Sequence, residues 1–123
     1  MIVAPRAVRI RVHREPVDMR KSFDTLTAVA RAAMHGDVLE GDVFVFVGRR
    51  RRHAKVLWWD GTGLILLAKR LVQGRFAAPW ESKKVGTLEW TQSELSLFLE
   101  GSELVTRMSL SPPIWQRTAV AFR

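Results

Sequence analysis

The stretch GDVFVFVGRRRRHAKVLWWDGTGLILLAKRLVQGRFAAPW, residues 41–80, decides the fold. It combines the most hydrophobic strand candidates of the chain with its densest positive charge. Residues 43–47 consist only of Val and Phe, which predicts a central strand buried on both faces. Gly48 and the four arginines that follow it then predict a hairpin loop, because a turn at this point leaves their charge in solvent.

Two more strands follow from the same stretch. The chain returns along residues 55–60, where two adjacent tryptophans point to opposite faces of the strand. Asp60-Gly61 predicts a tight turn, since this pair favours the positive φ angles of short hairpins. Residues 64–69 form the third strand of the meander. The apolar spacing of residues 64–72 also fits one face of a helix, but turn signals on both sides favour a strand.

Flanking elements extend this meander on its N-terminal side. Residues 8–13 alternate apolar and basic side chains, as expected of a strand with one buried face and one basic face in solvent. Asp18 is placed to cap a helix that begins at Met19, and Gly36 is placed to end it.

On the C-terminal side, residues 87–90 fit a short strand, and Thr91 with Glu94 forms a T-x-x-E capping box that opens a second helix. A tail with an irregular pattern starts at about residue 109. We therefore predict a single α+β domain over residues 1–123. It is an antiparallel β-meander of about four to five strands, packed with an N-terminal helix and a short C-terminal helix.

Composition limits the possible functions. The chain has 123 residues, 47% of them hydrophobic and 26% charged, which is typical of one globular domain. It contains no Cys, so disulfides, thiolate zinc sites and a cysteine nucleophile are excluded. We expect a cytoplasmic protein, because no apolar run approaches the roughly 20 residues of a membrane span and the N-terminus lacks the order of a signal peptide.

The charge is strongly positive and unevenly distributed. A net charge of +8 and a pI of 11.3 favour a polyanionic partner, either nucleic acid or an anionic membrane surface. Residues 49–84 hold ten Lys or Arg against two acids, whereas residues 87–105 hold four acids and no base. This distribution predicts a bipolar molecule.

The basic residues of the meander are the candidate nucleic-acid contacts. Guanidinium groups offer paired donors that suit phosphate oxygens, so an arginine loop can follow a nucleic-acid backbone. The predicted contacts are Arg49, Arg50, Arg51, Arg52, Lys55, Lys69, Arg70 and Arg75, with Lys83 and Lys84 as possible extensions. The alternative is a solvated loop tip that keeps an apolar hairpin soluble.

Aromatic residues beside this charge are candidates for stacking on unpaired bases. They are Trp58, Trp59, Trp80 and Phe76. Tryptophans in strands more often belong to the core, and at least one of the adjacent pair must face inward.

Catalytic signals are weak. His13, His35 and His53 have no metal-ligand spacing, and the serines lack a recognisable base or oxyanion turn. Asp60 and Glu81 could hold Mg²⁺ beside Lys83 as in some nucleases, but Asp60 is better explained as a turn residue. We expect no catalytic residue, metal or cofactor.

Motifs in a fixed order resemble one known family. They are DMRKSFDTL (residues 18–26), FVF followed by GRR and a Lys (residues 44–55), WDGTGL (residues 59–64), and KRL followed by GRF (residues 69–76). Together they resemble the TnpB-type accessory proteins of bacterial insertion sequences of the IS66 family, over about residues 8–101. Ser22 stands where that family commonly has Gly, and Ala68 where an aromatic is common, which argues against stacking at position 68.

The resemblance implies a helper of transposition that is encoded beside a separate, larger transposase and has no established catalytic activity. The leading hypothesis is an accessory protein that binds DNA through the arginine loop and its basic neighbours. The second hypothesis is a protein-interaction module that docks on the transposase, through its acidic C-terminal helix or its basic face, with DNA contact incidental. The third is a metal-dependent nuclease.

Overall fold

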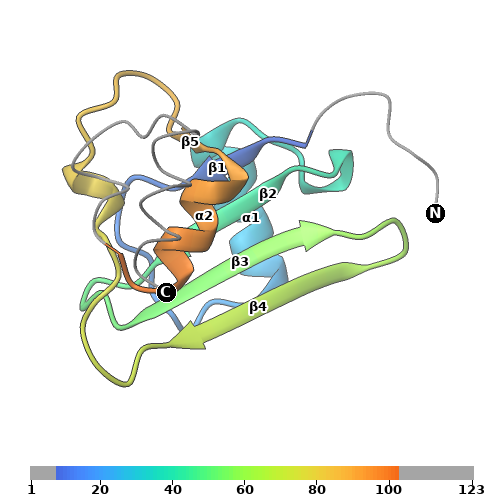
Figure 1. Ribbon diagram of the computed structural model, residues 1–123. Helices are drawn as coiled ribbons and strands as arrows, with labels where there is room; N and C mark the ends of the chain where they lie inside the picture. Colours follow the sequence, from blue (N-terminus) through green and yellow to red (C-terminus); the bar gives the residue numbers. More distant parts are fainter. Residues whose placement is uncertain (1–7, 103–123) are drawn as a thin grey trace.

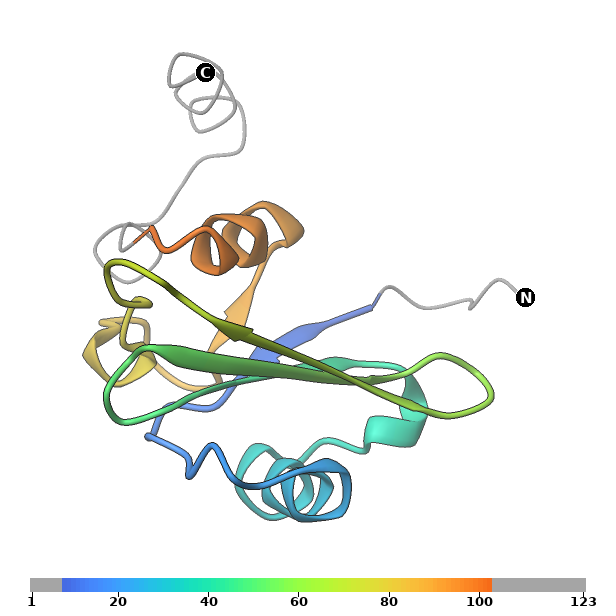
Figure 2. The ribbon, with the colours of Figure 1, turned by 90° about the horizontal axis from the view of Figure 1, so that it is seen from below.

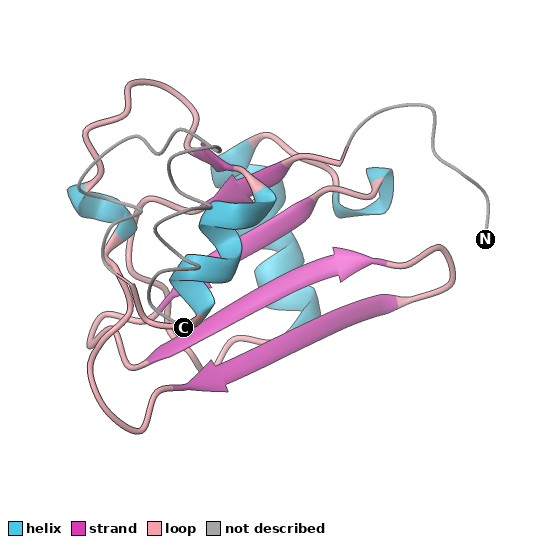
Figure 3. Ribbon diagram, viewed as in Figure 1, coloured by secondary structure: helices cyan, strands magenta, loops and turns pink. Residues whose placement is uncertain are grey.

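The computed structural model describes residues 8–102, in which a five-stranded sheet carries one helix on each face (Figures 1 and 2). The strand order is β4-β3-β2-β1-β5. Figure 3 separates these strands from the helices and loops. The strands are β1 (Ile10–Val12), β2 (Val43–Val47), β3 (His53–Trp59), β4 (Leu64–Arg70) and β5 (Glu89–Trp90). The helices are α1 (Phe23–Met34) and α2 (Gln92–Leu99), with short 3₁₀ turns η1 (Val38–Glu40) and η2 (Pro79–Glu81). The predicted tail from about residue 109 lies outside the described residues.

The predicted meander is confirmed. β2, β3 and β4 pair antiparallel, with Val45 opposite Val56 and Val56 opposite Leu67. The segment of residues 64–72, whose apolar spacing also fits a helix, forms a strand, β4, which pairs with β3 over its whole length. The turn before it closes on Asp60, whose Oδ1 accepts hydrogen bonds from the backbone N–H groups of Thr62 and Gly63, both at 2.9 Å.

The rest of the sheet is mixed, whereas we predicted an antiparallel meander. β1 pairs parallel to β2, with Ile10 opposite Val43, and β5 pairs antiparallel to β1. Parallel neighbours require a crossover connection, and α1 supplies it between β1 and β2. The prediction of a single α+β fold with two helices is confirmed.

Apolar side chains form one core on each face of the sheet. On the α1 side the buried residues include Leu26, Phe44 and Leu57, and on the α2 side they include Val45 and Phe98. β2 is apolar throughout because its alternate side chains enter the two cores, as predicted. The adjacent tryptophans of β3 also divide between the two sides: Trp58 packs on the α2 side and Trp59 on the α1 side.

The first helix begins later than predicted. Its N-terminal cap is Ser22, and the Ser22 N–H donates to Thr25 Oγ1 at 2.9 Å. Asp18 does not cap it; its carboxylate instead accepts from the Arg20 N–H at 2.9 Å and from the Arg20 guanidinium. This local turn keeps the backbone out of the helix until Ser22. The Arg20 hydrogen bonds also lower the pKa of Asp18.

The helix ends at Met34, two residues before the predicted terminator Gly36. His35 caps it in the left-handed conformation, with φ of 52°. Gly36 is needed for a different reason: a Cβ there would lie 2.6 Å from Cζ of Phe44. In contrast, α2 is confirmed with its capping box, in which Thr91 and Glu94 bind each other's backbone N–H groups.

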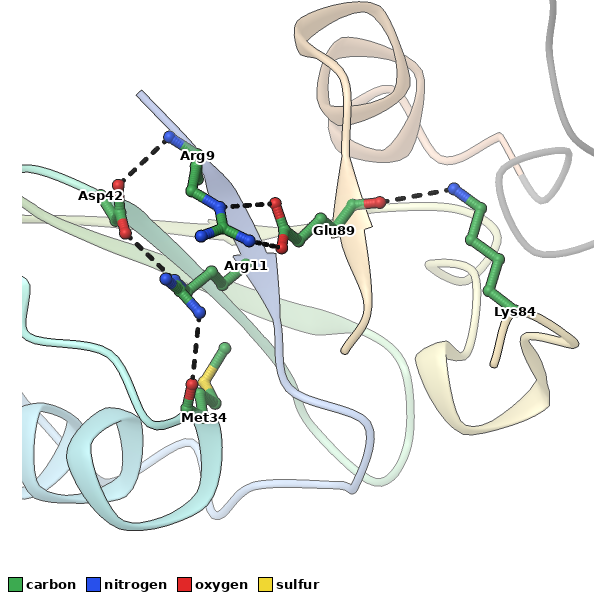
Figure 4. Close-up of polar contacts among 6 residues, drawn as sticks. All are labelled: Arg9, Arg11, Met34, Asp42, Lys84 and Glu89. Atoms are coloured by element: carbon green, nitrogen blue, oxygen red, sulfur yellow. Dashed lines mark hydrogen bonds and ion pairs between the residues drawn. The ribbon is translucent and has the colours of Figure 1, made fainter. Parts of the chain in front are cut away.

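The face of the first strand that we predicted to be basic and solvent-exposed is partly buried at Arg11, whose guanidinium reaches the Met34 carbonyl at the end of α1. The Arg11 side chain is only 14% exposed, and its Nε lies 3.0 Å from Oδ2 of buried Asp42 (Figure 4). Arg9 keeps its exposure, and its guanidinium pairs with Glu89, which raises the pKa of Arg9 and lowers that of Glu89. Arg9, just before β1, therefore pairs with β5, and Arg11 in β1 pairs with the residue that precedes β2. No helix of the described part of the chain is long and apolar enough to cross a membrane.

Candidate nucleic-acid interface

Two basic loops meet at one end of the meander. One joins β2 to β3 through residues 48–52, and the other leaves β4 through residues 71–75; both lie at the lower left of Figure 1. They meet because β3 begins where β4 ends, with His53 opposite Arg70. Together with Arg70, the last residue of β4, these loops carry five exposed arginines, which we call the arginine end: Arg49, Arg50, Arg52, Arg70 and Arg75.

Hydrogen bonds join the two loops. The Leu71 N–H donates to the carbonyl of Arg52 at 2.9 Å, and the Phe76 N–H donates to the carbonyl of Arg51 at 2.7 Å. The Arg51 side chain returns to the same place, where its Nε donates to the Phe76 carbonyl at 2.7 Å. Arg51 also has a positive φ of 63°, in the left-handed region. The loops therefore form one stable platform for the five exposed arginines.

Three of the predicted contacts have structural roles. Arg51 bridges the loops as described. Lys55 Nζ donates to the carbonyl of Lys21 at 2.7 Å, so it ties the segment before α1 to β3. Lys69 Nζ donates to the carbonyl of Leu99 at 2.6 Å, where a cation stabilises the free carbonyls at the end of α2. The structure thus brings five of the eight predicted residues together as exposed arginines, while Lys69 is exposed as well but its ammonium binds the Leu99 carbonyl.

The stacking prediction is wrong for Phe76, which is fully buried. Its ring lies 4.9 Å from that of Phe98 and completes the core under α2. Trp58, Trp59 and Trp80 are each half-buried and packed against one of the two cores. These rings belong mainly to the fold.

Two carboxylates of the acidic C-terminal part, Glu89 and Glu94, are engaged by cations of the same chain. Glu94 is 4% exposed; it accepts from the Thr91 N–H and lies 3.4 Å from Lys84 Nζ. Lys84 also donates to the backbone carbonyl of Glu89, whose carboxylate binds Arg9 (Figure 4). Lys84 therefore does not extend the arginine end, and the described acids Glu89 and Glu94 each have a cationic partner.

The residues of the nuclease alternative are not assembled. Asp60 lies in the β3–β4 turn, and Glu81 lies in η2, far from that turn at the other end of the molecule (Figure 1). Hydrogen bonds from the Thr62 and Gly63 N–H groups lower the pKa of Asp60, which accords with a turn role. Within residues 8–102 no group of three or more His, Asp or Glu is placed to hold a metal ion.

His53 is an exposed neighbour of the arginine end that is not among the nucleic-acid contacts predicted from the sequence. It is the first residue of β3 and lies opposite Arg70. Its signal in the sequence was its position directly after the arginine run.

Comparisons with known proteins find one matching family model and two similar proteins. The model of the family described as IS66 Orf2 like protein matches residues 8–108. The chain is 37% identical over 112 residues to the uncharacterized protein y4jC of Sinorhizobium fredii, which covers 91% of this chain and 93% of that protein. It is 35% identical over 101 residues to the uncharacterized protein y4hO of the same organism, covering 82% and 86%. No solved structure shows a significant match.

Proposed function

The chain belongs to the IS66 Orf2-like family of transposition accessory proteins, and we propose that it assists transposition by binding DNA through the arginine end. The observation that carries this proposal is the placement of five exposed guanidinium groups on two joined loops and the adjoining end of β4. Asp60, the one acidic residue between positions 43 and 80, lies at the far end of the meander, so no carboxylate of that stretch neutralises them. Phosphate is the ligand class that fits such a surface.

The binding mode follows from this chemistry. Contacts from arginine to phosphate position a protein on DNA but carry little sequence information. The hydrogen bonds between the loops fix the backbone in advance, which reduces the entropy lost on binding. We therefore expect binding that falls steeply with salt and depends weakly on sequence.

The test compares Arg50→Ala with Arg31→Ala by fluorescence anisotropy on duplexes of unrelated sequence. Both residues are exposed, and both changes remove one positive charge. Arg31 is in the last turn of α1, and the end of that helix lies near Asp42, just before β2, because Arg11 binds both Met34 and Asp42. The arginine loop follows the opposite end of β2, so Arg31 lies away from it. Arg50→Ala should weaken binding several-fold and Arg31→Ala should not. Equal affinities of the two variants would refute the proposed site.

A protein-interaction module that docks on the transposase is the second candidate. Glu89 in β5 is engaged by Arg9, and Glu94 in α2 is engaged by Lys84, so these two carboxylates are not free for such docking. Co-purification with the transposase after nuclease treatment separates the two candidates. A surviving complex, together with no DNA affinity of the isolated chain, would favour docking over DNA binding.

The proposal assigns the chain no catalytic step. Incubation of supercoiled and linear DNA with the protein in Mg²⁺ or Mn²⁺ should leave the DNA intact. Cleavage that Asp60→Ala abolishes would overturn this part of the proposal.

A further inference from the structure

The outer edge of β4 is long, regular and without a described partner. Within residues 8–102, β4 pairs only with β3, one residue to one residue over its whole length, and it borders the sheet in Figure 1. The other edge strand, β5, has only two residues. Natural sheets protect long edges with charges, proline or bulges. The first five residues of β4, Leu64–Ala68 in sequence LILLA, have none of these devices.

Alternation along the strand shows which backbone groups face outward. Hydrogen bonds from the Asp60 N–H to the Gly63 carbonyl and from the Leu71 N–H to the Arg52 carbonyl mark the paired positions at the two ends of the hairpin. In an antiparallel ladder every second residue bonds to the neighbouring strand. The odd-numbered residues of β4 therefore bond to β3. The N–H and C=O groups that face away from β3 belong to Leu64, Leu66, Ala68 and Arg70.

We propose that β4 pairs with β4 of a second copy of this chain, antiparallel and centred on Leu67, to form a symmetric dimer with a continuous sheet. This register matches the outward-facing groups of one copy with those of the other. It is also the symmetric register that uses all seven residues. The opposed pairs are Leu64 with Arg70, Ile65 with Lys69, Leu66 with Ala68, and Leu67 with its own counterpart.

The charge pattern of β4 makes it complementary to itself. Its two cations, Lys69 and Arg70, lie at one end, and antiparallel pairing sets them against the apolar residues at the other end of the second copy. Their aliphatic stems can cover Ile65 and Leu64, so like charges are not opposed. At the centre, Leu67 is 38% exposed and would meet its counterpart. Two-fold pairing is the commonest closed assembly of soluble proteins.

Sedimentation velocity of the full chain tests the dimer. The expected mass is twice the 14.0 kDa of the chain. Leu67→Lys should yield monomers, because it opposes two lysines at the centre of the interface. Val85→Lys is the matched control, since Val85 is 98% exposed and precedes β5 at the other edge of the sheet. Higher salt should strengthen the dimer, because each copy carries a net charge of +8.

Ala68→Pro tests the same edge if the lysine variant does not fold. It removes one outward N–H and leaves the bonds to β3 intact, so it should also yield monomers. A wild-type chain that stays monomeric at its highest soluble concentration overturns the proposal, whether the edge is covered by its own terminal residues or by another protein. A dimer that persists in both edge variants overturns it as well.

Cysteine crosslinking tests the register, because the chain has no Cys of its own. Opposed residues at such a non-hydrogen-bonded position have Cα atoms about 4.5 Å apart, within the range for a disulfide. Leu67→Cys should therefore crosslink between copies under mild oxidation. Ile65→Cys should not, because its thiols would lie about 13 Å apart along the strands. Equal crosslinking of Leu67→Cys and the control Val85→Cys would contradict the register.

Discussion

Arg51 should stabilise the fold, unlike its exposed neighbours in the same loop. Its Nε donates to the Phe76 carbonyl at 2.7 Å, and its side chain is half-buried. A hydrogen bond from a charged donor contributes about 1.5–3 kcal/mol when buried, so we expect Arg51→Ala to lower the free energy of unfolding by about 1–2 kcal/mol. Arg50→Ala removes the same side chain from an exposed position and should change it by less than about 0.5 kcal/mol.

The backbone at Arg51 adds a second, independent expectation. Its φ of 63° is unfavourable for any residue with a Cβ, by about 1–2 kcal/mol. Alanine retains this strain and glycine removes it, although glycine also loses about 0.5–1 kcal/mol of chain entropy on folding. Arg51→Gly should therefore be more stable than Arg51→Ala by about 0.5–1 kcal/mol.

Urea denaturation followed by tryptophan fluorescence measures all three variants, since the chain has five tryptophans. The reasoning is refuted if Arg51→Ala unfolds at the same urea concentration as Arg50→Ala. It is also refuted if the glycine variant is less stable than the alanine variant.

Three further predictions concern the charged groups of the fold. Asp42→Asn should lower stability by about 2–4 kcal/mol, because it leaves the mostly buried Arg11 guanidinium without a carboxylate; a loss below about 1 kcal/mol in urea denaturation would contradict this. Glu94→Ala should lower stability by about 1–2 kcal/mol through loss of the capping box; thermal melts matching those of wild type would exclude that role. The pKa values of Glu89 and Asp60 are lowered in the folded state, so the contribution of their carboxylates to the free energy of unfolding is complete above about pH 4.5 and is lost as the pH falls through the folded-state pKa values. A melting temperature that stays constant down to pH 3 would argue against this contribution.

The meander could be predicted because its signals are local. The all-apolar run of β2, the Asp60-Gly61 turn and the arginine run each specify their own segment. The parallel pairing of β1 could not be predicted, since it depends on how α1 packs across the sheet. The start of α1 was also misplaced, because Asp18 closes a turn with Arg20 that competes with a helix cap.

Part of the candidate site could likewise be predicted from the sequence, and part could not. Once the meander was predicted, antiparallel pairing was enough to bring Arg70 to the arginine loop. The structural roles of Arg51, Lys55 and Lys69 could not be predicted from the sequence. Their side chains bind backbone carbonyls that lie 25, 34 and 30 residues away, and no sequence pattern marks a carbonyl as an acceptor. Basic sequence alone therefore overestimated the number of free cations.

The most direct test of DNA binding at the arginine end measures affinity for a labelled duplex as a function of salt. The wild type is compared with a variant in which Arg49, Arg50, Arg52, Arg70 and Arg75 are all replaced by Ala, with tryptophan fluorescence confirming that the variant is folded. If each guanidinium neutralises one phosphate, the logarithm of the wild-type binding constant should fall with the logarithm of salt concentration with a slope of about −4 to −5. The variant should bind weakly, with a slope much closer to zero. Equal affinity and equal slope for the two proteins would contradict the proposal.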